Sequence, residues 1–125
     1  MAVVDFDRPD LAKIIETLTV EEIDALPFGT VRLDHEGKVI LFSEAEARLS
    51  GFGSRDRIGL TFFTDIAPCM NTDAFRRQTE NAIAAGTLDV EFMHIGDFED
   101  RDRELTIKIQ SAADGGMWVF LRRES

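Results

Sequence analysis

Hydrophobic residues recur at two different spacings along this chain, and each spacing predicts a different kind of element. In residues 9–18 they return every three or four positions, which places them on one face of a helix, behind Pro9 and Asp10 as start signals. The apolar positions of this segment are Leu11, Ile14, Ile15 and Leu18. We therefore expect a short amphipathic helix near this end of the chain.

A second helix is expected directly afterwards. Thr19 and Glu22 have the spacing of a capping box, in which the side chain of each residue accepts a hydrogen bond from the backbone N–H of the other. The segment "PFG" at 27–29 then ends the helix, because proline and glycine both interrupt helical backbone. Residues 1–27 are thus predicted to form an N-terminal helical lead-in.

Strands are expected where β-branched and apolar residues form short runs. "TVRLD" and "KVILF" are separated by "HEG", which predicts a hairpin whose turn contains Gly37 with a positive φ. Helical segments are predicted in "SEAEARLSG" and at 71–86, which Gly86 closes. Three more strands are expected in "TLDVEFMHI", "RELTIKIQ" and "GGMWVFLRR".

The order of two strands, helices and three strands resembles the layout of a PAS domain, in which helices pack over one face of a five-stranded antiparallel sheet. The expected fold class is therefore α+β. The chain has 125 residues, 44% of them hydrophobic and ten of them Phe, which is enough for one core. We expect a single domain with an N-terminal helical cap over residues 1–27 and a PAS core over residues 28–125.

Charge and hydropathy exclude several kinds of partner. Lys and Arg number 14 and Asp and Glu number 24, so the net charge of −10 repels nucleic-acid phosphates and anionic lipid. No apolar run approaches the roughly 20 residues that span a bilayer, and the start "MAVVDFDRPD" lacks the features of a signal peptide. We expect a cytoplasmic protein, monomeric or weakly dimeric, that contacts neither nucleic acid nor membrane.

The only cysteine, Cys69, lies in the stretch "FFTDIAPCMN" and cannot form an internal disulfide. It is either a small buried hydrophobic residue or a thiol with a chemical role. A predicted helix begins just after it, and the dipole at a helix N-terminus lowers the pKa of a thiol, which favours the thiolate needed for acyl transfer. His35 and His94 belong to other expected elements, so no metal site with the usual ligand spacing is expected around Cys69.

Four stretches of the sequence together resemble the photoactive yellow protein family, whose members are blue-light receptors with a PAS fold. They are "PFGTVRLD" at 27–34, "AEA" with Glu46 inside it, "FFTDIAPC" at 62–69 and "WVFLRR" at 118–123. The resemblance covers nearly the whole chain, with one deletion near 111–117, and the segment that ends at Cys69 is its most specific part. It implies a photosensor and not an enzyme, in which Cys69, next to Pro68, carries p-coumaric (4-hydroxycinnamic) acid as a thioester.

The resemblance also implies a role for Glu46. In the family, a buried and neutral glutamate donates a hydrogen bond to the phenolate oxygen of the pigment and gives up its proton after light isomerises the double bond. From spacing alone, Ser43 and Glu46 form another capping box, in which the carboxylate of Glu46 accepts the backbone N–H of Ser43. The sequence leaves both interpretations open.

Several positions depart from the family. Phe42 replaces a tyrosine that donates to the phenolate, Ser50 replaces a supporting threonine, and Phe52 aligns with an arginine that covers the ring. The missing donor raises the pKa of a bound phenol, so two absorption bands are expected to exchange with pH. His94, where the family has an aromatic phenol, is either a hydrogen-bonded core residue or a titrating neighbour of the pigment. Phe62 completes the candidate site, although a core of this size also needs it.

Other functions are alternatives. The first is a PAS ligand-binding or interaction module without a pigment, and the second is a thiol-dependent redox sensor. The third is a hydrolase that uses Cys69 and His94, although the sequence shows no signature of a third catalytic residue. A downstream signalling protein is expected as partner, and the sequence does not identify it, because no kinase, cyclase or DNA-binding segment follows "FLRRES". Proton loss from Glu46 in the light is expected to loosen the N-terminal lead-in first.

Overall fold

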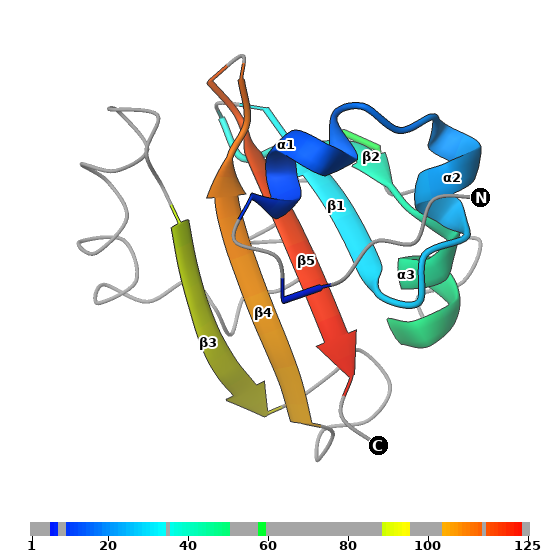
Figure 1. The fold of residues 1–125 in the computed structure, drawn as a ribbon, viewed down its shortest axis with the longest axis vertical. Helices are drawn as coiled ribbons and strands as arrows, with labels where there is room; N and C mark the ends of the chain where they lie inside the picture. Colours follow the sequence, from blue (N-terminus) through cyan, green and yellow to red (C-terminus); the bar gives the residue numbers. More distant parts are fainter. Residues whose placement is uncertain are drawn as a thin grey trace.

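The computed structural model describes residues 6–7, 10–34, 36–50, 58–59, 89–95, 104–113 and 115–123. At residues 49, 50, 92, 94 and 95 it describes the backbone alone. The described helices and strands, in chain order, are α1 (Leu11–Ile15), α2 (Val20–Asp24), β1 (Gly29–Leu33), β2 (Val39–Phe42), α3 (Glu44–Ser50), β3 (Asp89–Ile95), β4 (Glu104–Ser111) and β5 (Met117–Arg123) (Figure 1). The helix predicted at 71–86 lies outside the described residues.

The five strands form one antiparallel sheet in the order β2-β1-β5-β4-β3. β5 lies in the middle, where Val119 is opposite Val31 of β1 and Leu121 is opposite Ile107 of β4. β1 and β5 are therefore neighbours inside the sheet, although they are far apart in the sequence (Figure 1). The predicted α+β class and the five-stranded antiparallel sheet are confirmed.

The turn between β1 and β2 has the predicted chemistry. Gly37 has a φ of 83°, in the left-handed region that residues with a Cβ rarely adopt. Asp34 stabilises the same turn, because its Oδ1 accepts the backbone N–H of Glu36 at 2.8 Å and that of Lys38 at 3.0 Å. These contacts satisfy backbone donors at the point where the strand ladder ends.

Both helices of the N-terminal lead-in are short. α1 ends at Ile15, earlier than predicted, because the N–H groups of Thr17 and Leu18 donate to carbonyls three residues back and so tighten the last turn. α2 begins with the predicted capping box. The N–H of Glu22 donates to Oγ1 of Thr19 at 3.2 Å, and the N–H of Thr19 donates to Oε1 of Glu22 at 3.1 Å.

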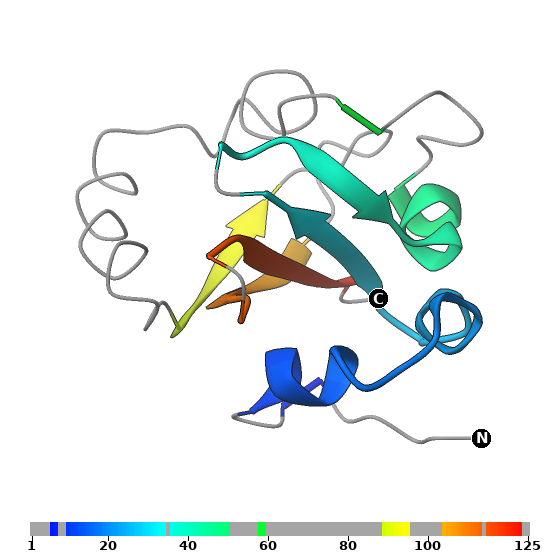
Figure 2. The ribbon, with the colours of Figure 1, turned by 90° about the horizontal axis from the view of Figure 1, so that it is seen from above.

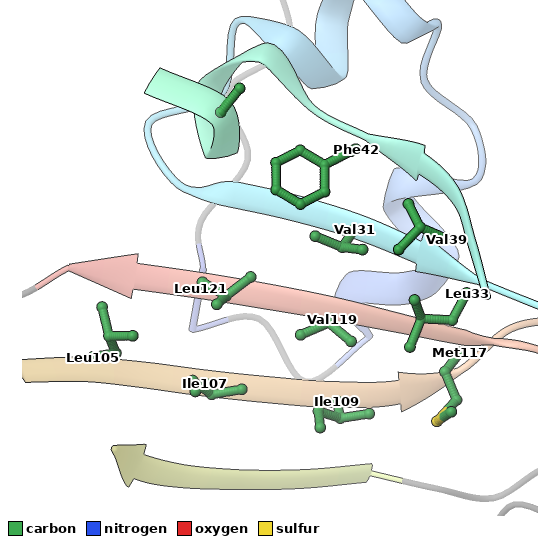
Figure 3. Close-up of a cluster of buried hydrophobic side chains, with 11 residues drawn as sticks. Val31, Leu33, Val39, Phe42, Leu105, Ile107, Ile109, Met117, Val119 and Leu121 are labelled. Atoms are coloured by element: carbon green, nitrogen blue, oxygen red, sulfur yellow. The ribbon is translucent and has the colours of Figure 1, made fainter. Parts of the chain in front are cut away.

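Side chains alternate between the two faces of the sheet, and each face has its own core. Along β5, Val119 and Leu121 belong to one core, whereas Trp118 and Phe120 belong to the other. The first is named the α3-side core, and its buried members are Val31, Leu33, Val39, Phe42, Ala47, Leu105, Ile107, Ile109, Met117, Val119 and Leu121 (Figure 3). The second is named the cap-side core, and its buried members are Phe6, Leu11, Ala12, Ile15, Ile23, Leu26, Phe28, Ala112, Trp118 and Phe120.

The N-terminal lead-in and α3 cover opposite faces of the sheet. Figure 2 shows α1 on one side of the strands and α3 on the other. The lead-in is attached through aromatic contacts, since the ring of Phe28 meets that of Phe6 edge-on at 5.4 Å and that of Phe120 at 6.2 Å between centroids. The lead-in therefore closes the cap-side core and leaves the α3-side core for the candidate site. A domain boundary after residue 27 stays a prediction.

Candidate functional site

Glu46 lies in the first turn of α3, and the start of this helix is fixed by Ser43. The Oγ of Ser43 accepts the N–H of Glu46 at 3.0 Å and also the N–H of Thr30 at 3.1 Å, which ties the helix to β1. The N–H of Ser43 donates to the carbonyl oxygen of Thr30 at 2.9 Å. The predicted capping box is therefore half formed: the Ser43 side chain caps the helix, while the carboxylate of Glu46 binds elsewhere.

The partner of that carboxylate is Arg123, at the end of β5. Both terminal nitrogens of the guanidinium contact it: Nη1 donates to Oε1 of Glu46, and Nη2 donates to Oε2 at 2.8 Å. Each of the two side chains is 6% exposed, although Arg123 as a whole residue is only half-buried at the end of its strand. This two-point geometry is the one in which arginine binds a carboxylate most strongly.

The alternation of β5 explains why Arg123 reaches this place. Val119 and Leu121 face the α3-side core, and the side chain two residues beyond them follows the same direction. Arg123 is paired in the sheet with Leu105 of β4, a buried member of the same core. The strand therefore places one charged group at the edge of an apolar surface, in contact with Glu46 of α3.

Gly29 makes room for the ion pair. A Cβ built on this residue would overlap Oε1 of Glu46 and would also crowd the rest of its side chain. Gly29 opens β1 and is paired with Leu121, two residues before Arg123. The need for glycine at this position thus comes from close packing against the carboxyl.

Burial and pairing act on the charge of Glu46 in opposite directions. Removing a carboxylate from water disfavours its ionised form, whereas an adjacent guanidinium with two hydrogen bonds favours it. Burying a carboxylate without a partner of opposite charge costs free energy, and the contact with Arg123 supplies such a partner. The burial predicted for Glu46 is confirmed, while its predicted neutral state stays a prediction.

Three further predicted site residues fall within the described backbone. Phe42 ends β2, is 7% exposed and belongs to the α3-side core with Val31 and Leu121 (Figure 3). Its ring offers an apolar wall and no hydroxyl. Ser50 ends α3, and His94 lies in β3 opposite Leu105. Because Arg123 is opposite the same Leu105 from the other side, His94 and Arg123 occupy one row across three strands.

The other half of the predicted site, namely Phe52, Phe62, Pro68 and Cys69, lies outside the described residues. The structure brings Glu46 and Arg123 together on the face that holds Phe42. Arg123 and Gly29 were not among the site residues predicted from the sequence. A signal for Arg123 was available, since the alternation in "WVFLRR" puts position 123 on the same face as 119 and 121. No comparable signal in the sequence connected Gly29 with Glu46.

Among the described residues, no helix combines the length and the apolar character needed to cross a bilayer. Within the same ranges, no group of His, Cys, Asp and Glu side chains is arranged to hold a metal ion.

Comparisons with known proteins agree on the relatives of this chain, although no protein-family model matches it. Photoactive yellow protein of Rhodothalassium salexigens is 30% identical over 124 residues, which are 98% of this chain and 99% of the relative. Photoactive yellow protein of Halochromatium salexigens is 27% identical over the same length and coverage.

Solved structures give the same result. The photoactive yellow protein domain of the sensor histidine kinase Ppr of Rhodospirillum centenum has a TM-score of 0.70 and 33% identity, covering 87% of this chain and 96% of that domain. A PAS domain from Colwellia psychrerythraea, 15% identical with a TM-score of 0.61 and coverage of 83% and 92%, shares the fold. The sheet and its two covered faces thus define a PAS domain. The chain belongs to the photoactive yellow protein family, which is a family of photoreceptors.

Proposed function

We propose that this protein is a blue-light sensor in which Cys69 carries p-coumaric acid as a thioester and Glu46 binds the phenolic end of that group. The observation that supports this most is the buried carboxyl of Glu46 at the edge of an apolar core, at the position where the family has its pigment-binding glutamate. When bound, the pigment supplies visible absorption and a double bond that light isomerises.

The described residues fit such a group. An aromatic ring needs an apolar wall, which Phe42 and its neighbours in the α3-side core provide. A phenolic oxygen needs a polar partner, and the carboxyl of Glu46 is one that can donate or accept according to its protonation. The hydroxyl that a tyrosine would supply at position 42 is missing, so one of the family's hydrogen bonds to the pigment is absent from this side chain.

The chemistry of the signal is assigned to Glu46. Its carboxyl group releases a proton and the phenolic oxygen takes it up, so the negative charge moves from the phenolic oxygen to Glu46. The total charge of the site is unchanged by this step. A carboxylate formed in this way stays buried, so the surrounding structure has to hold the new charge or rearrange to hydrate it.

One experiment tests the attachment. Apoprotein is mixed with activated p-coumarate, and absorbance and intact mass are measured, with Cys69→Ala as control. We expect a visible band and the mass gain of one coumaroyl group, mapped to the peptide that contains Cys69 and absent from the variant. An intact free thiol on Cys69 under these conditions would disprove the proposed function.

The effect of Phe42 on the bound phenol has a separate test. A dark absorbance titration of the reconstituted protein, beside its Phe42→Tyr variant, follows the neutral and ionised forms of the pigment. Because a hydrogen bond to a charged acceptor favours that charge, the variant should show more of the ionised band at mildly acidic pH. Identical titrations would mean that position 42 does not control ionisation.

The signal is proposed to leave through the N-terminal lead-in, whose two described helices, α1 and α2, are only five residues long each. Illumination should raise amide hydrogen exchange in residues 1–27 more than in β4 and β5. Equal exchange in light and darkness across the lead-in would rule out this route.

A second candidate function is a PAS ligand-binding or interaction module without pigment. Two observations favour it: the donor at Phe42 is lost, and Glu46 already has a partner in Arg123. The reconstitution experiment separates the two functions, because only a photosensor couples the pigment to Cys69.

A further inference from the structure

The ion pair of Arg123 and Glu46 places a positive charge next to the carboxyl that is proposed to bind the pigment. Both side chains are 6% exposed, so this charge is poorly screened by solvent. The family resemblance implied an arginine at position 52, where this chain has phenylalanine. Arg123 therefore places a positive charge on the α3 side of the sheet, whereas position 52 supplies none in this chain.

We propose that Arg123 is the counter-ion of this site: it holds Glu46 as a carboxylate in the pigment-free protein, and its charge balances whichever of Glu46 and the phenolic oxygen is negative once a pigment is bound. The statement about the phenolic oxygen rests on the proposed function. The statement about Glu46 does not.

Charge balance in a buried place supports this role of Arg123. One guanidinium neutralises one anion, so a carboxylate and a phenolate side by side would leave an uncompensated negative charge. A single proton shared between the two oxygens avoids this state, and moving it from one oxygen to the other keeps the total charge constant. Arg123 contacts Glu46 through both carboxylate oxygens, which makes the state with a Glu46 carboxylate especially favourable.

The geometry fits a residue that acts through Glu46. The guanidinium is held from one side by the carboxylate, and the absent Cβ of Gly29 lets that carboxylate come close to the backbone of β1. Arg123 is thus a positioning residue for the charge of Glu46. Arg122, its neighbour in sequence, points to the opposite face, where its guanidinium lies 4.6 Å from the centroid of the Phe6 ring. It offers a matched control with the same charge.

The first experiment uses apoprotein with ¹³C-labelled glutamate, in which NMR reports the protonation of Glu46, assigned with Glu46→Gln. At neutral pH we expect an ionised Glu46 in the wild-type protein and in Arg122→Met, and a protonated one in Arg123→Met, because a buried carboxylate that loses its guanidinium partner takes up a proton more readily. A protonated Glu46 in the wild-type protein, or an ionised one in Arg123→Met, would overturn the counter-ion role.

A stability measurement covers the case in which Arg123→Met folds poorly. Breaking one side of a buried pair should lower the folding equilibrium constant by about two to three orders of magnitude. In the Glu46→Gln background the same change should lower it by no more than about tenfold. Arg123→Lys keeps the charge but loses the two-point contact, so it should fold and leave Glu46 ionised. Equal losses in both backgrounds would show that the two side chains are not coupled.

The last measurement uses reconstituted protein at one neutral pH and compares the ratio of ionised to neutral pigment absorbance. In Glu46→Gln the guanidinium no longer balances a charge at position 46, so the ratio of ionised to neutral pigment should exceed that of the double variant Glu46→Gln, Arg123→Met by about tenfold or more. Adding Arg122→Met to Glu46→Gln should leave it unchanged. Equal ratios in Glu46→Gln and the double variant would refute the pigment part. If no pigment attaches, the proposed function fails, while the apoprotein spectra still decide whether Arg123 ionises Glu46.

Discussion

The two faces of the sheet bury charged side chains in different ways. On the cap side, Lys108 is 5% exposed, and its Nζ donates to the backbone carbonyl of Phe6 at 2.7 Å. Its carboxylate partner Glu91, 3.9 Å away, is half exposed. On the α3 side, Arg123 and Glu46 are both buried and face each other.

The difference lies in what each buried charge is attached to. Lys108 binds the backbone of the N-terminal segment, and Gln110 does the same by accepting the N–H of Ala12 at 2.7 Å. These polar groups therefore join two parts of the chain, and their loss should loosen the lead-in. The pair on the α3 side joins two side chains whose charges depend on each other, so its loss should change protonation as well as stability.

The largest effect is expected for Phe120→Ala. Phe120 has no exposed surface, meets Phe28 edge-on and stacks on Trp118 at 6.1 Å, so the truncation leaves a cavity that should cost about 3–5 kcal/mol in urea unfolding. Val119→Ala is the control on the other face of β5. Amide exchange in residues 10–26 should rise in the first variant and not in the second. Equal exchange in both would mean that the two cores are not energetically separate.

Lys108→Met should follow, at about 1.5–3 kcal/mol, because it removes the charged donor from the carbonyl of Phe6. Exchange should increase in the lead-in while the protonation of Glu46 stays as in the wild-type protein. Lys38→Met is a suitable control, since Lys38 is about half exposed and pairs only loosely with Glu36 at 3.5 Å. A change in the Glu46 carboxyl resonance in Lys108→Met would connect the two faces.

Gly29→Ala should cost about 1–3 kcal/mol, because the added methyl group overlaps the carboxyl of Glu46. Combined with Glu46→Ala, the same substitution should cost much less, so the two changes should be non-additive in a double-mutant cycle. Additive effects would indicate that Gly29 is needed for a reason other than space for Glu46.

The smallest effect is expected for Asp7→Ala. Asp7 is two-thirds exposed and its Oδ1 accepts from Nη1 of Arg122 at 3.1 Å, a surface ion pair worth at most about 1 kcal/mol. The difference between the variant and the wild-type protein should shrink with added salt. A loss comparable to that of Lys108→Met would show that the cap depends on its exposed charges as much as on its buried ones.

Much of the fold followed from local patterns. The capping box of Thr19 and Glu22, the turn at Gly37 and the five strands were all predicted from short segments, and all are present. The end of α1 was not predicted correctly, because the tightened turn at Thr17 and Leu18 depends on which carbonyl oxygens accept their N–H groups. Family motifs in the sequence also led to the photoactive yellow protein family, which the relatives confirm.

For the candidate site, the sequence by itself determined which residue types are available: a carboxyl at position 46, a phenyl ring at 42 and an arginine at 123. Only the tertiary structure decided that the carboxyl pairs with this arginine, 77 residues away, and that Gly29 leaves space for the contact. The local alternative was a capping box, in which the carboxylate of Glu46 accepts the backbone N–H of Ser43. The distant contact forms because the central position of β5 and its register bring a guanidinium next to the buried carboxylate. A buried carboxylate requires a partner of opposite charge, and a single backbone N–H does not supply one.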